Sequence, residues 1–312
     1  MSSEANKSPG PSQARFTVTW WGVRGSTQVP GPSCVKFGGN TTCLEIRCDD
    51  ERLIIDAGTG LRALGQGHDE SAPFQATLLF THYHLDHVVG LPFFAPLFRA
   101  SSSLRFVGDP AVGGGPQANL KGLMTAPFFP LEFSTLPSAI DFGRLEVGAS
   151  TPIGPAVVKT CLMNHPGAAS GLRIEHRGHA FVHLSDVEHC GQESASELVA
   201  LTRGADVLSY DAMFDEEVDY SPHRGWGHST WQAGSRLAVE AKVGRYVATH
   251  HAPEHDDAFL DGVSTKLHAI LPNAIVAWEG LELDLLTGAV HSRCIPPNRL
   301  MAALVADAGV VE

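Results

Sequence analysis

Short apolar runs separated by turn-rich polar segments make up most of the chain, a pattern that predicts a mixed α/β fold. Runs rich in Val, Ile, Leu and Phe that are bounded by polar, Gly or Pro residues indicate buried β-strands. We expect such strands over residues 16–21, 42–46, 53–55, 76–80, 180–184, 207–210 and 246–249. Apolar residues at helical spacing predict helices over 60–65, 87–97, 193–202 and 229–243, the last with Ser229 or Thr230 as its N-cap.

Several predicted strands end at His or Asp residues, which indicates that functional groups gather along one edge of a sheet sandwich. The sequence contains no internal repeat of useful length and no segment that resembles a linker. We therefore expect one domain over residues 15–294. Residues 1–14 are polar and are expected to form a disordered N-terminal tail, and residues 295–312 a short C-terminal tail.

Composition narrows the class of protein. Of the 312 residues, 43% are hydrophobic and 18% are charged, as in an ordinary soluble globular protein. The formal net charge of −12 argues against a nucleic-acid polymer as partner, because such a surface needs clustered Lys and Arg. A small anionic substrate is still compatible with this charge, because bound metal ions supply local positive charge.

The six cysteines form no paired motif, and the polar N-terminus lacks the apolar core of a signal peptide. No apolar stretch is long enough to span a membrane. These features favour a cytoplasmic location, free thiols and no membrane partner.

The densest chemistry lies directly after the predicted strand 76–80, in the sequence Thr-His-Tyr-His-Leu-Asp-His at residues 81–87. In an extended segment His82 and His84 project to the same side, so the pair can bind one metal ion. Asp86 and His87 follow where the chain turns, and they can reach a second ion. Imidazole nitrogen and carboxylate oxygen suit zinc first, and manganese or iron next.

With these four ligands in place, the chain from about residue 16 to 290 resembles the metallo-β-lactamase superfamily. The resemblance implies an α/β fold, the αββα sandwich of two mixed sheets packed face to face with helices outside. It also implies two divalent metal ions, Zn²⁺ being the expected one. The further ligands would be His165 for the first ion, His250 for the second, and Asp186 bridging both.

Two of these positions have neighbours that compete for the same role. Glu188 is the alternative to Asp186, which we prefer because it directly follows a predicted strand. His251 is the alternative to His250, and it would otherwise lie beside the site and contact the substrate. Asp56 matches a family position that supports the metal loop without binding metal.

Two motifs, Tyr-Asp at 210–211 and Gly-His-Ser-Thr at 227–230, resemble paired motifs of the tRNA 3′-processing endonuclease-like phosphodiesterases. There a histidine at the His228 position, oriented by a carboxylate at the Asp211 position, acts as general acid. This chain has Asp where that branch commonly has Glu, which shortens the reach of the carboxylate. By this resemblance the catalytic residues are His228, Asp211 and the metal ligand Asp86.

The segment 82–87 also matches the HxHLDH signature of class II cyclic-nucleotide phosphodiesterases, and residues 22–26, 38–41 and 92–94 resemble related bacterial proteins. In those proteins the last ligand commonly lies in His-His-Asp-Pro, whereas Ala252 replaces the Asp here. We therefore expect hydrolysis of a small phosphodiester, a cyclic nucleotide first. A hydroxide between the metals would attack phosphorus, His228 would protonate the leaving oxygen, and Arg24 would stabilise the phosphate unless it lies in an exposed turn.

Two alternatives on the same fold stay open at this point. One is tRNA 3′-end processing, which usually needs a basic arm that this sequence lacks. The other is a diiron redox or oxygen-sensing protein, which the nitrogen and oxygen ligand set permits. The resemblance also makes a homodimer one of the assemblies to test.

Overall fold

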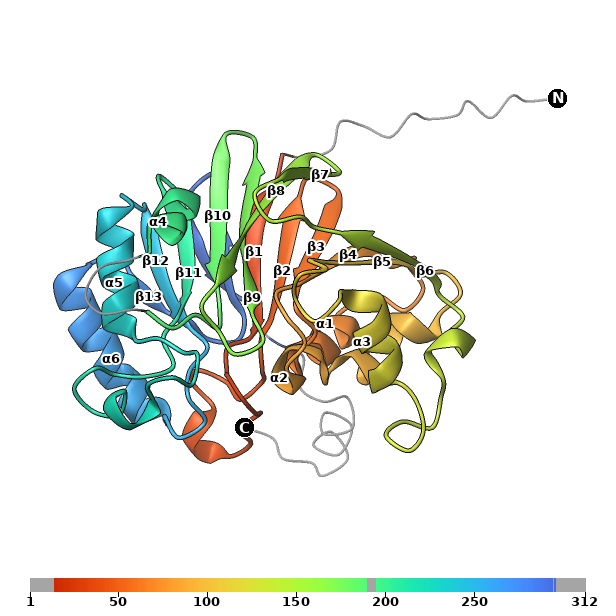
Figure 1. Cartoon of the computed structure of the whole chain (residues 1–312), viewed down its shortest axis with the longest axis horizontal. Helices are drawn as coiled ribbons and strands as arrows, with labels where there is room; N and C mark the ends of the chain where they lie inside the picture. The colour runs from red at the N-terminus through yellow and green to blue at the C-terminus, as the bar shows by residue number, and fades with distance from the viewer. Residues whose placement is uncertain (1–13, 190–194, 294, 296–312) are drawn as a thin grey trace, which may run out of the picture.

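Two β-sheets packed face to face form the centre of the molecule, with helices on both outer sides (Figure 1). The computed structural model describes residues 14–189, 195–293 and 295. The first sheet has the strand order β15(Val290–Ser292), β14(Leu281–Asp284), β1(Phe16–Gly22), β2(Cys43–Cys48), β3(Glu51–Ile55), β4(Gln75–Phe80), β5(Ser103–Gly108), β6(Ala139–Arg144). The second has the order β13(Ile275–Val276), β12(Arg245–Thr249), β11(Val207–Asp211), β10(His179–Leu184), β9(Ala169–His176), β8(Ala156–Met163), β7(Ser150–Ile153).

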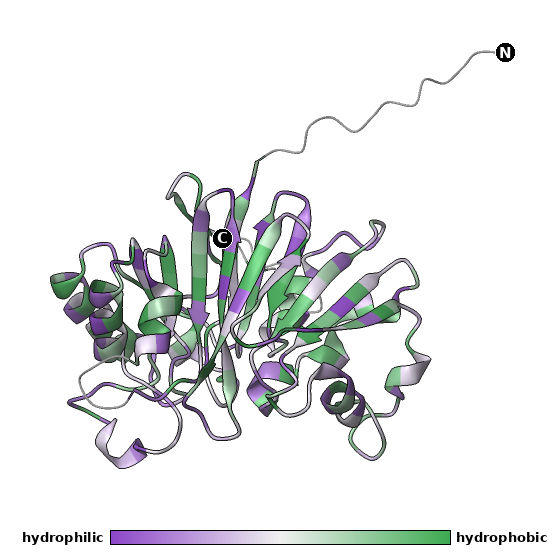
Figure 2. Ribbon diagram, turned by 45° about the horizontal axis from the view of Figure 1, so that its top comes forward, coloured by the Kyte–Doolittle hydropathy of each residue, from purple (hydrophilic) through white to green (hydrophobic). Residues whose placement is uncertain are grey.

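Three apolar cores hold these layers together. The central core lies between the sheets, where Trp20 of β1 meets Phe181 of β10 edge to face. A second core packs the outer face of the second sheet against α4(Ser196–Thr202), α5(Trp231–Glu240) and α6(Asp257–Ile270). A third packs the first sheet against α1(Gly60–Gln66) and α3(Pro116–Leu123). Figure 2 shows hydrophobic positions concentrated on the strands, as burial on both faces requires.

The strands expected from the apolar runs are confirmed, each to within about two residues at either end. Two of the expected helices are also confirmed as α1 and α5. Thr230 is the N-cap of α5, and its hydroxyl accepts a hydrogen bond from the Ala233 amide at 3.1 Å. The helix expected over 193–202 is α4, although residues 193 and 194 lie outside the described part of the chain.

The single helix expected over 87–97 is wrong. The chain forms a short helix α2(Leu85–Val88) and then two 3₁₀ turns, η2(Leu91–Phe93) and η3(Ala95–Phe98). Pro92 and Pro96 lack an amide hydrogen, so each begins a new turn and cannot continue an earlier helix. Helix α2 therefore ends one residue after His87. Asp86 and His87 lie within it and are buried.

The cysteines within the described part, Cys34, Cys43, Cys48 and Cys161, are buried free thiols. None of the helices in that part has both the length and the hydropathy that crossing a bilayer would need. The tails expected at residues 1–14 and 295–312 lie almost wholly outside the described residues.

A salt bridge between Asp49 and Arg177 joins a turn of the first sheet to a turn of the second sheet. The carboxylate of Asp49, between β2 and β3, accepts hydrogen bonds from Arg177 Nε at 3.0 Å and Nη2 at 2.9 Å, in the turn between β9 and β10. These bonds to Arg177 hold the pKa of Asp49 below its ordinary value.

We expect Asp49→Asn to lower the free energy of unfolding at pH 7 by about 1 kcal/mol, because a bidentate pair is lost from the surface. The lowered pKa makes this contribution present above about pH 4 and lost as the pH falls further. Urea denaturation at pH 7 and pH 3 measures this contribution to the free energy of unfolding. Asp141→Asn is the matched control, because Asp141 on β6 forms a more exposed ion pair with Arg105 at 3.3 Å. A difference between Asp49→Asn and wild type that grows toward pH 3 would contradict the sign.

Candidate metal centre

The His and Asp side chains of the predicted site lie close together, at the ends of strands from both sheets. Strands β10, β11 and β12 run parallel, so their carboxyl ends lie next to one another on the same side of the second sheet. Asp186, Asp211 and His250 lie at these three ends. The segment 81–87 follows β4 of the first sheet, and His165 lies in the turn between β8 and β9. The fold therefore brings together residues that are far apart in the sequence.

A first group of potential ligands consists of His82, His84, His165 and Asp186, whose ligand atoms all lie within 4.8 Å of one another. His165 Nε2 lies 3.0 Å from His84 Nδ1 and 3.7 Å from Asp186 Oδ1. His82 Nε2 also lies 3.7 Å from Asp186 Oδ1. Three imidazoles and one carboxylate around a common centre match the ligand set of a four-coordinate metal ion.

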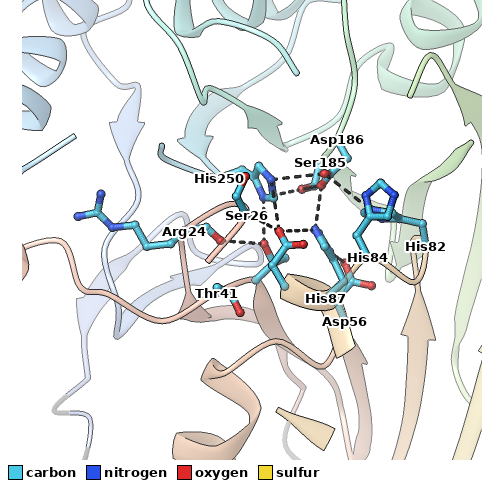
Figure 3. Close-up of polar contacts among 12 residues, drawn as sticks. Arg24, Ser26, Thr41, Asp56, His82, His84, His87, Ser185, Asp186 and His250 are labelled. Atoms are coloured by element: carbon cyan, nitrogen blue, oxygen red, sulfur yellow. Dashed lines mark hydrogen bonds and ion pairs between the residues drawn. The ribbon is translucent and has the colours of Figure 1, made fainter. Parts of the chain in front are cut away.

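A second group consists of Asp86, His87, Asp186 and His250, all of them buried. His87 Nε2 lies 3.2 Å from Asp86 Oδ2 and 3.1 Å from Asp186 Oδ2. His250 Nε2 lies 3.4 Å from Asp186 Oδ1 (Figure 3). Asp186 is the one residue that belongs to both groups, and Glu188 belongs to neither.

The ring nitrogens that face these centres are suited to a metal ion. The Nε2 atoms of His82, His87 and His250 are buried without a hydrogen-bond partner. A buried polar atom without a partner is costly, and a bound cation removes that cost. The residues present therefore fit the two divalent ions that the sequence predicts.

Four of these histidines are held through Nδ1, so that Nε2 is the ring nitrogen that faces the ligand groups. The Nδ1 of His87 donates to Asp56 at 2.8 Å, and that of His165 donates to the Gly227 carbonyl at 2.8 Å. The Nδ1 of His82 lies 3.1 Å from the Thr81 hydroxyl, and that of His250 lies 3.0 and 3.1 Å from the hydroxyls of Thr42 and Ser185. A partner on one nitrogen fixes the proton there and orients the other toward the metal.

The electrostatics of the two groups agree with cation binding. Burial lowers the pKa of His82 and His165, which favours the neutral imidazole that binds metal. Burial would also raise the pKa of Asp186, but the surrounding His250, His87 and His82 hold it well below the ordinary value. Asp186 therefore offers an ionised carboxylate at the centre of the site.

Two of the potential ligands have strained backbones. Asp186 and His250 have φ angles of 63° and 62°, in the left-handed region that side chains other than glycine rarely adopt. Asp56 shares this conformation with φ 59°. Such strain at a cluster of buried polar side chains is typical of functional sites, where the surrounding fold holds a few residues in place.

Asp56 orients the second group. Its Oδ1 accepts from the Thr81 amide at 2.8 Å, and its Oδ2 accepts from the Thr81 hydroxyl at 2.7 Å and from His87 Nδ1. In Asp56→Asn an amide NH₂ would face His87, which would favour the tautomer that carries its proton on Nε2. We expect metal affinity to fall about 10–100-fold, as for other partners of metal-binding histidines.

A titration against a chelator of known affinity measures this effect in Asp56→Asn. Asp141→Asn is the matched control, because it makes the same change of side chain at an exposed position of β6, away from the site. Unchanged metal affinity in Asp56→Asn would show that Asp56 does not set the tautomer of His87.

Asp211 and His228 form a buried pair beside the two groups. His228 Nδ1 donates to Asp211 Oδ2 at 2.9 Å and lies 3.8 Å from Asp186 Oδ1. Asp211 also accepts bonds from the amides of Asp186 at 3.0 Å and Met213 at 3.1 Å, so its carboxylate is fixed. Burial alone would lower the pKa of His228, but Asp211 and its hydrogen bond raise it to about 9.

The structure does not support substrate contacts for Arg24 or His251. Arg24 is fully buried, not in an exposed turn, and points away from the ligand cluster (Figure 3). Its guanidinium donates to the carbonyls of Gly38 at 2.8 Å, Ala252 at 3.1 Å and His255 at 2.6 Å. His251 is 1% exposed and donates through Nε2 to the Ala277 carbonyl at 2.9 Å. Both side chains tie the loops around the site together.

The hydroxyl residues that orient the imidazoles were not among the predicted site residues. Thr81 and Ser185 each come directly before a potential ligand, and this adjacency was the available signal. Thr42 carries no such signal, because it meets His250 across 208 positions of the chain.

Comparisons with known proteins agree with this architecture. The profile of the family described as "Beta-lactamase superfamily domain" matches residues 51–251. An uncharacterized protein of Mycobacterium leprae, ML1173, is 28% identical over 207 residues, which are 66% of this chain and 69% of that protein. A ribonuclease Z of Mycobacterium sp. (strain KMS) is 23% identical over 242 residues, covering 73% of this chain and 82% of the enzyme.

The metallo-beta-lactamase fold protein YhfI of Bacillus subtilis superposes with a TM-score of 0.66. The two chains are 18% identical, and the superposition covers 87% of this chain and 100% of YhfI. This likeness concerns the fold, and it confirms the αββα sandwich expected from the sequence.

Proposed function

The chain belongs to the beta-lactamase superfamily, and from this membership and the geometry of its site we propose that it is a metal-dependent hydrolase of small or cyclic phosphodiesters. A cyclic nucleotide is the first candidate substrate. In this proposal His82, His84 and His165 hold one metal ion, Asp86, His87 and His250 hold the other, and Asp186 is shared. Zn²⁺ suits this ligand set best, and Mn²⁺ and Fe²⁺ are the alternatives.

Two divalent ions bound there would lower the pKa of a water molecule and offset charge on the phosphate oxygens. The protein keeps the ligands buried and oriented, so little reorganisation is needed during the reaction. The backbone amide of Ser26 donates to Asp86 Oδ2 at 2.8 Å and fixes that carboxylate as well.

The pairing of His228 with Asp211 is the observation that carries the proposal. Because Nδ1 of His228 donates to Asp211, the other ring nitrogen is the one available to a substrate. The ring lies close to both ligand groups, with its centroid 5.3 Å from that of His165 and 5.2 Å from that of His250. An oriented imidazole at this position can give a proton to an alcohol that leaves phosphorus.

The ribonuclease Z relative and the net charge bear on the size of the substrate. The relative is named as a ribonuclease, and ribonucleases cleave phosphodiester bonds in RNA. This similarity supports a phosphodiester as the substrate of the present chain. The net charge of −12 disfavours a long polyanion, since an extended RNA surface needs clustered basic residues. Together these two observations favour a short or cyclic diester.

Turnover of a substrate panel after reconstitution with Zn²⁺ or Mn²⁺ tests the proposal. The panel contains bis-p-nitrophenyl phosphate, 2′,3′- and 3′,5′-cyclic nucleotides and a precursor tRNA. We expect hydrolysis of the small diesters that a chelator abolishes and added metal restores. Cleavage of the precursor tRNA alone would favour RNA processing, and hydrolysis of none would refute diester hydrolysis.

A further inference from the structure

A cavity of about 460 Å³ opens beside the candidate metal centre on the side of His165. This volume falls within the range of roughly 300–1,000 Å³ usual for small-molecule sites. The cavity is lined by Asn164, His165, Pro166, Glu188, His189 and Gly225. His165 links it to the metal centre, whereas Glu188 and His189 take no part in the reaction proposed above.

One residue next to the proposed proton donor in the chain contacts the cavity wall twice. Gly227, directly before His228, accepts from His165 Nδ1 through its carbonyl and donates to Glu188 Oε2 at 2.9 Å through its amide. Its φ is +88°, and a Cβ there would lie 2.4 Å from His165 Nδ1, so this close approach requires glycine. Gly227 therefore connects two residues of the cavity wall to the backbone of the proposed proton donor.

His189 is held rigidly in the wall of the cavity. Its Nδ1 lies 2.8 Å from the Ser229 hydroxyl, which in turn lies 2.9 Å from the Tyr210 hydroxyl. The ring also stacks on Tyr220, with centroids 4.7 Å apart. A side chain fixed on two sides loses little conformational entropy when it contacts a ligand.

The charges around the cavity disfavour a second phosphate. The Glu188 carboxylate lies in the wall, where it accepts from the amides of Gly225 at 2.6 Å and Gly227. Burial lowers the pKa of His189, which favours the neutral imidazole. The six lining residues include neither Lys nor Arg, and the guanidinium of Arg224 lies over the Tyr220 ring at 5.6 Å.

We propose that this cavity is a subsite for the leaving group and that it accepts a neutral, hydroxyl-bearing group such as the nucleoside part of a cyclic nucleotide. The inference rests on the proposed function and adds a substrate class to it. Carboxylate, amide and imidazole groups can bind sugar hydroxyls, and the Glu188 carboxylate repels an added phosphate. The enzyme would thus select cyclic nucleotides without a further phosphate.

A matched pair of substrates tests this selectivity, namely 2′,3′-cyclic AMP and the same compound with a 5′-phosphate. We expect kcat/KM of the metal-loaded wild type to favour the compound without the 5′-phosphate by at least about tenfold, because like charges in a partly buried site repel. His189→Lys would place an ammonium in the cavity and is expected to shrink this preference about tenfold or reverse it. His189→Gln, which stays neutral, is the control and should keep the preference.

Bis-p-nitrophenyl phosphate, assayed in parallel, separates failure of this inference from failure of the proposed function. Equal kcat/KM for both nucleotides, or preference for the phosphorylated one, would overturn the inference. Hydrolysis of bis-p-nitrophenyl phosphate without hydrolysis of either nucleotide would also overturn it, while the proposed function would stand. Hydrolysis of none of the three would overturn both.

Discussion

Asp186→Ala is expected to lose tight binding of both metal ions and to lower diester hydrolysis by more than about 100-fold. Asp186 is the residue shared by the two ligand groups, with oxygens 3.1 Å from His87 Nε2 and 3.4 Å from His250 Nε2. Removal of a partner outside the ligand shell already costs about 10–100-fold in metal affinity or activity, so loss of a shared ligand should cost more. Metal analysis after gel filtration and initial rates with bis-p-nitrophenyl phosphate measure the two effects.

Asp141→Ala is the matched control for Asp186→Ala, because Asp141 is an exposed aspartate on β6. It should keep the metal content and the rate of wild type. Two tightly bound ions in Asp186→Ala would show that this carboxylate does not bridge, and the assignment of both ligand groups would then fail.

His228→Ala is expected to lower turnover of cyclic nucleotides by about 10²–10⁴-fold while metal content stays at the wild-type level. His228 contacts Asp211 and lies outside the proposed metal ligands, so its loss should remove a proton donor and leave the ions in place. A p-nitrophenolate leaving group needs no protonation. We therefore expect the rate with bis-p-nitrophenyl phosphate to fall much less than the rate with a cyclic nucleotide.

The difference between these two substrates is the informative result for His228. His268→Ala, on an exposed position of α6, is the control for loss of an imidazole elsewhere. Equal losses on both substrates would indicate a general disturbance of the site. Loss of the metal ions would make His228 a ligand, an outcome opposed to the role proposed for it.

Local patterns predicted the parts of the molecule that neighbouring residues determine. The apolar run at 76–80 indicated a buried strand, and the alternation of His82 and His84 placed both in one ligand group, as the structure has them. Asp86 and His87 similarly fall in the other group. Strand alternation and a following turn are sufficient for such a prediction.

The remaining ligands depend on contacts that are distant in sequence. His165, Asp186 and His250 reach the site from three separate strand ends, and residue spacing alone does not bring them together. The resemblance to a family supplied these positions. The choice of Asp186 over Glu188 rested on adjacency to the strand end, and the structure gives the reason: Glu188 binds the amides of Gly225 and Gly227.

Besides the broken helix at 87–97, two parts of the structure differ from the expectations, for different reasons. Arg24 lies in a turn-like segment, but carbonyl oxygens 228 and 231 positions away accept from its guanidinium and bury it. Helix α6 was not predicted, although Asp256 caps it and Leu260, Val263 and Leu267 lie at helical spacing. That signal was available in the sequence.

Metal-dependent diester hydrolysis is tested by the dependence of the initial rate of bis-p-nitrophenyl phosphate hydrolysis on the amount of zinc bound per chain. Metal-free protein titrated with Zn²⁺ should be inactive at first, and the rate should reach its plateau at two bound ions per chain. Full activity in metal-free protein, or no hydrolysis with two ions bound, would refute metal-dependent diester hydrolysis by this protein.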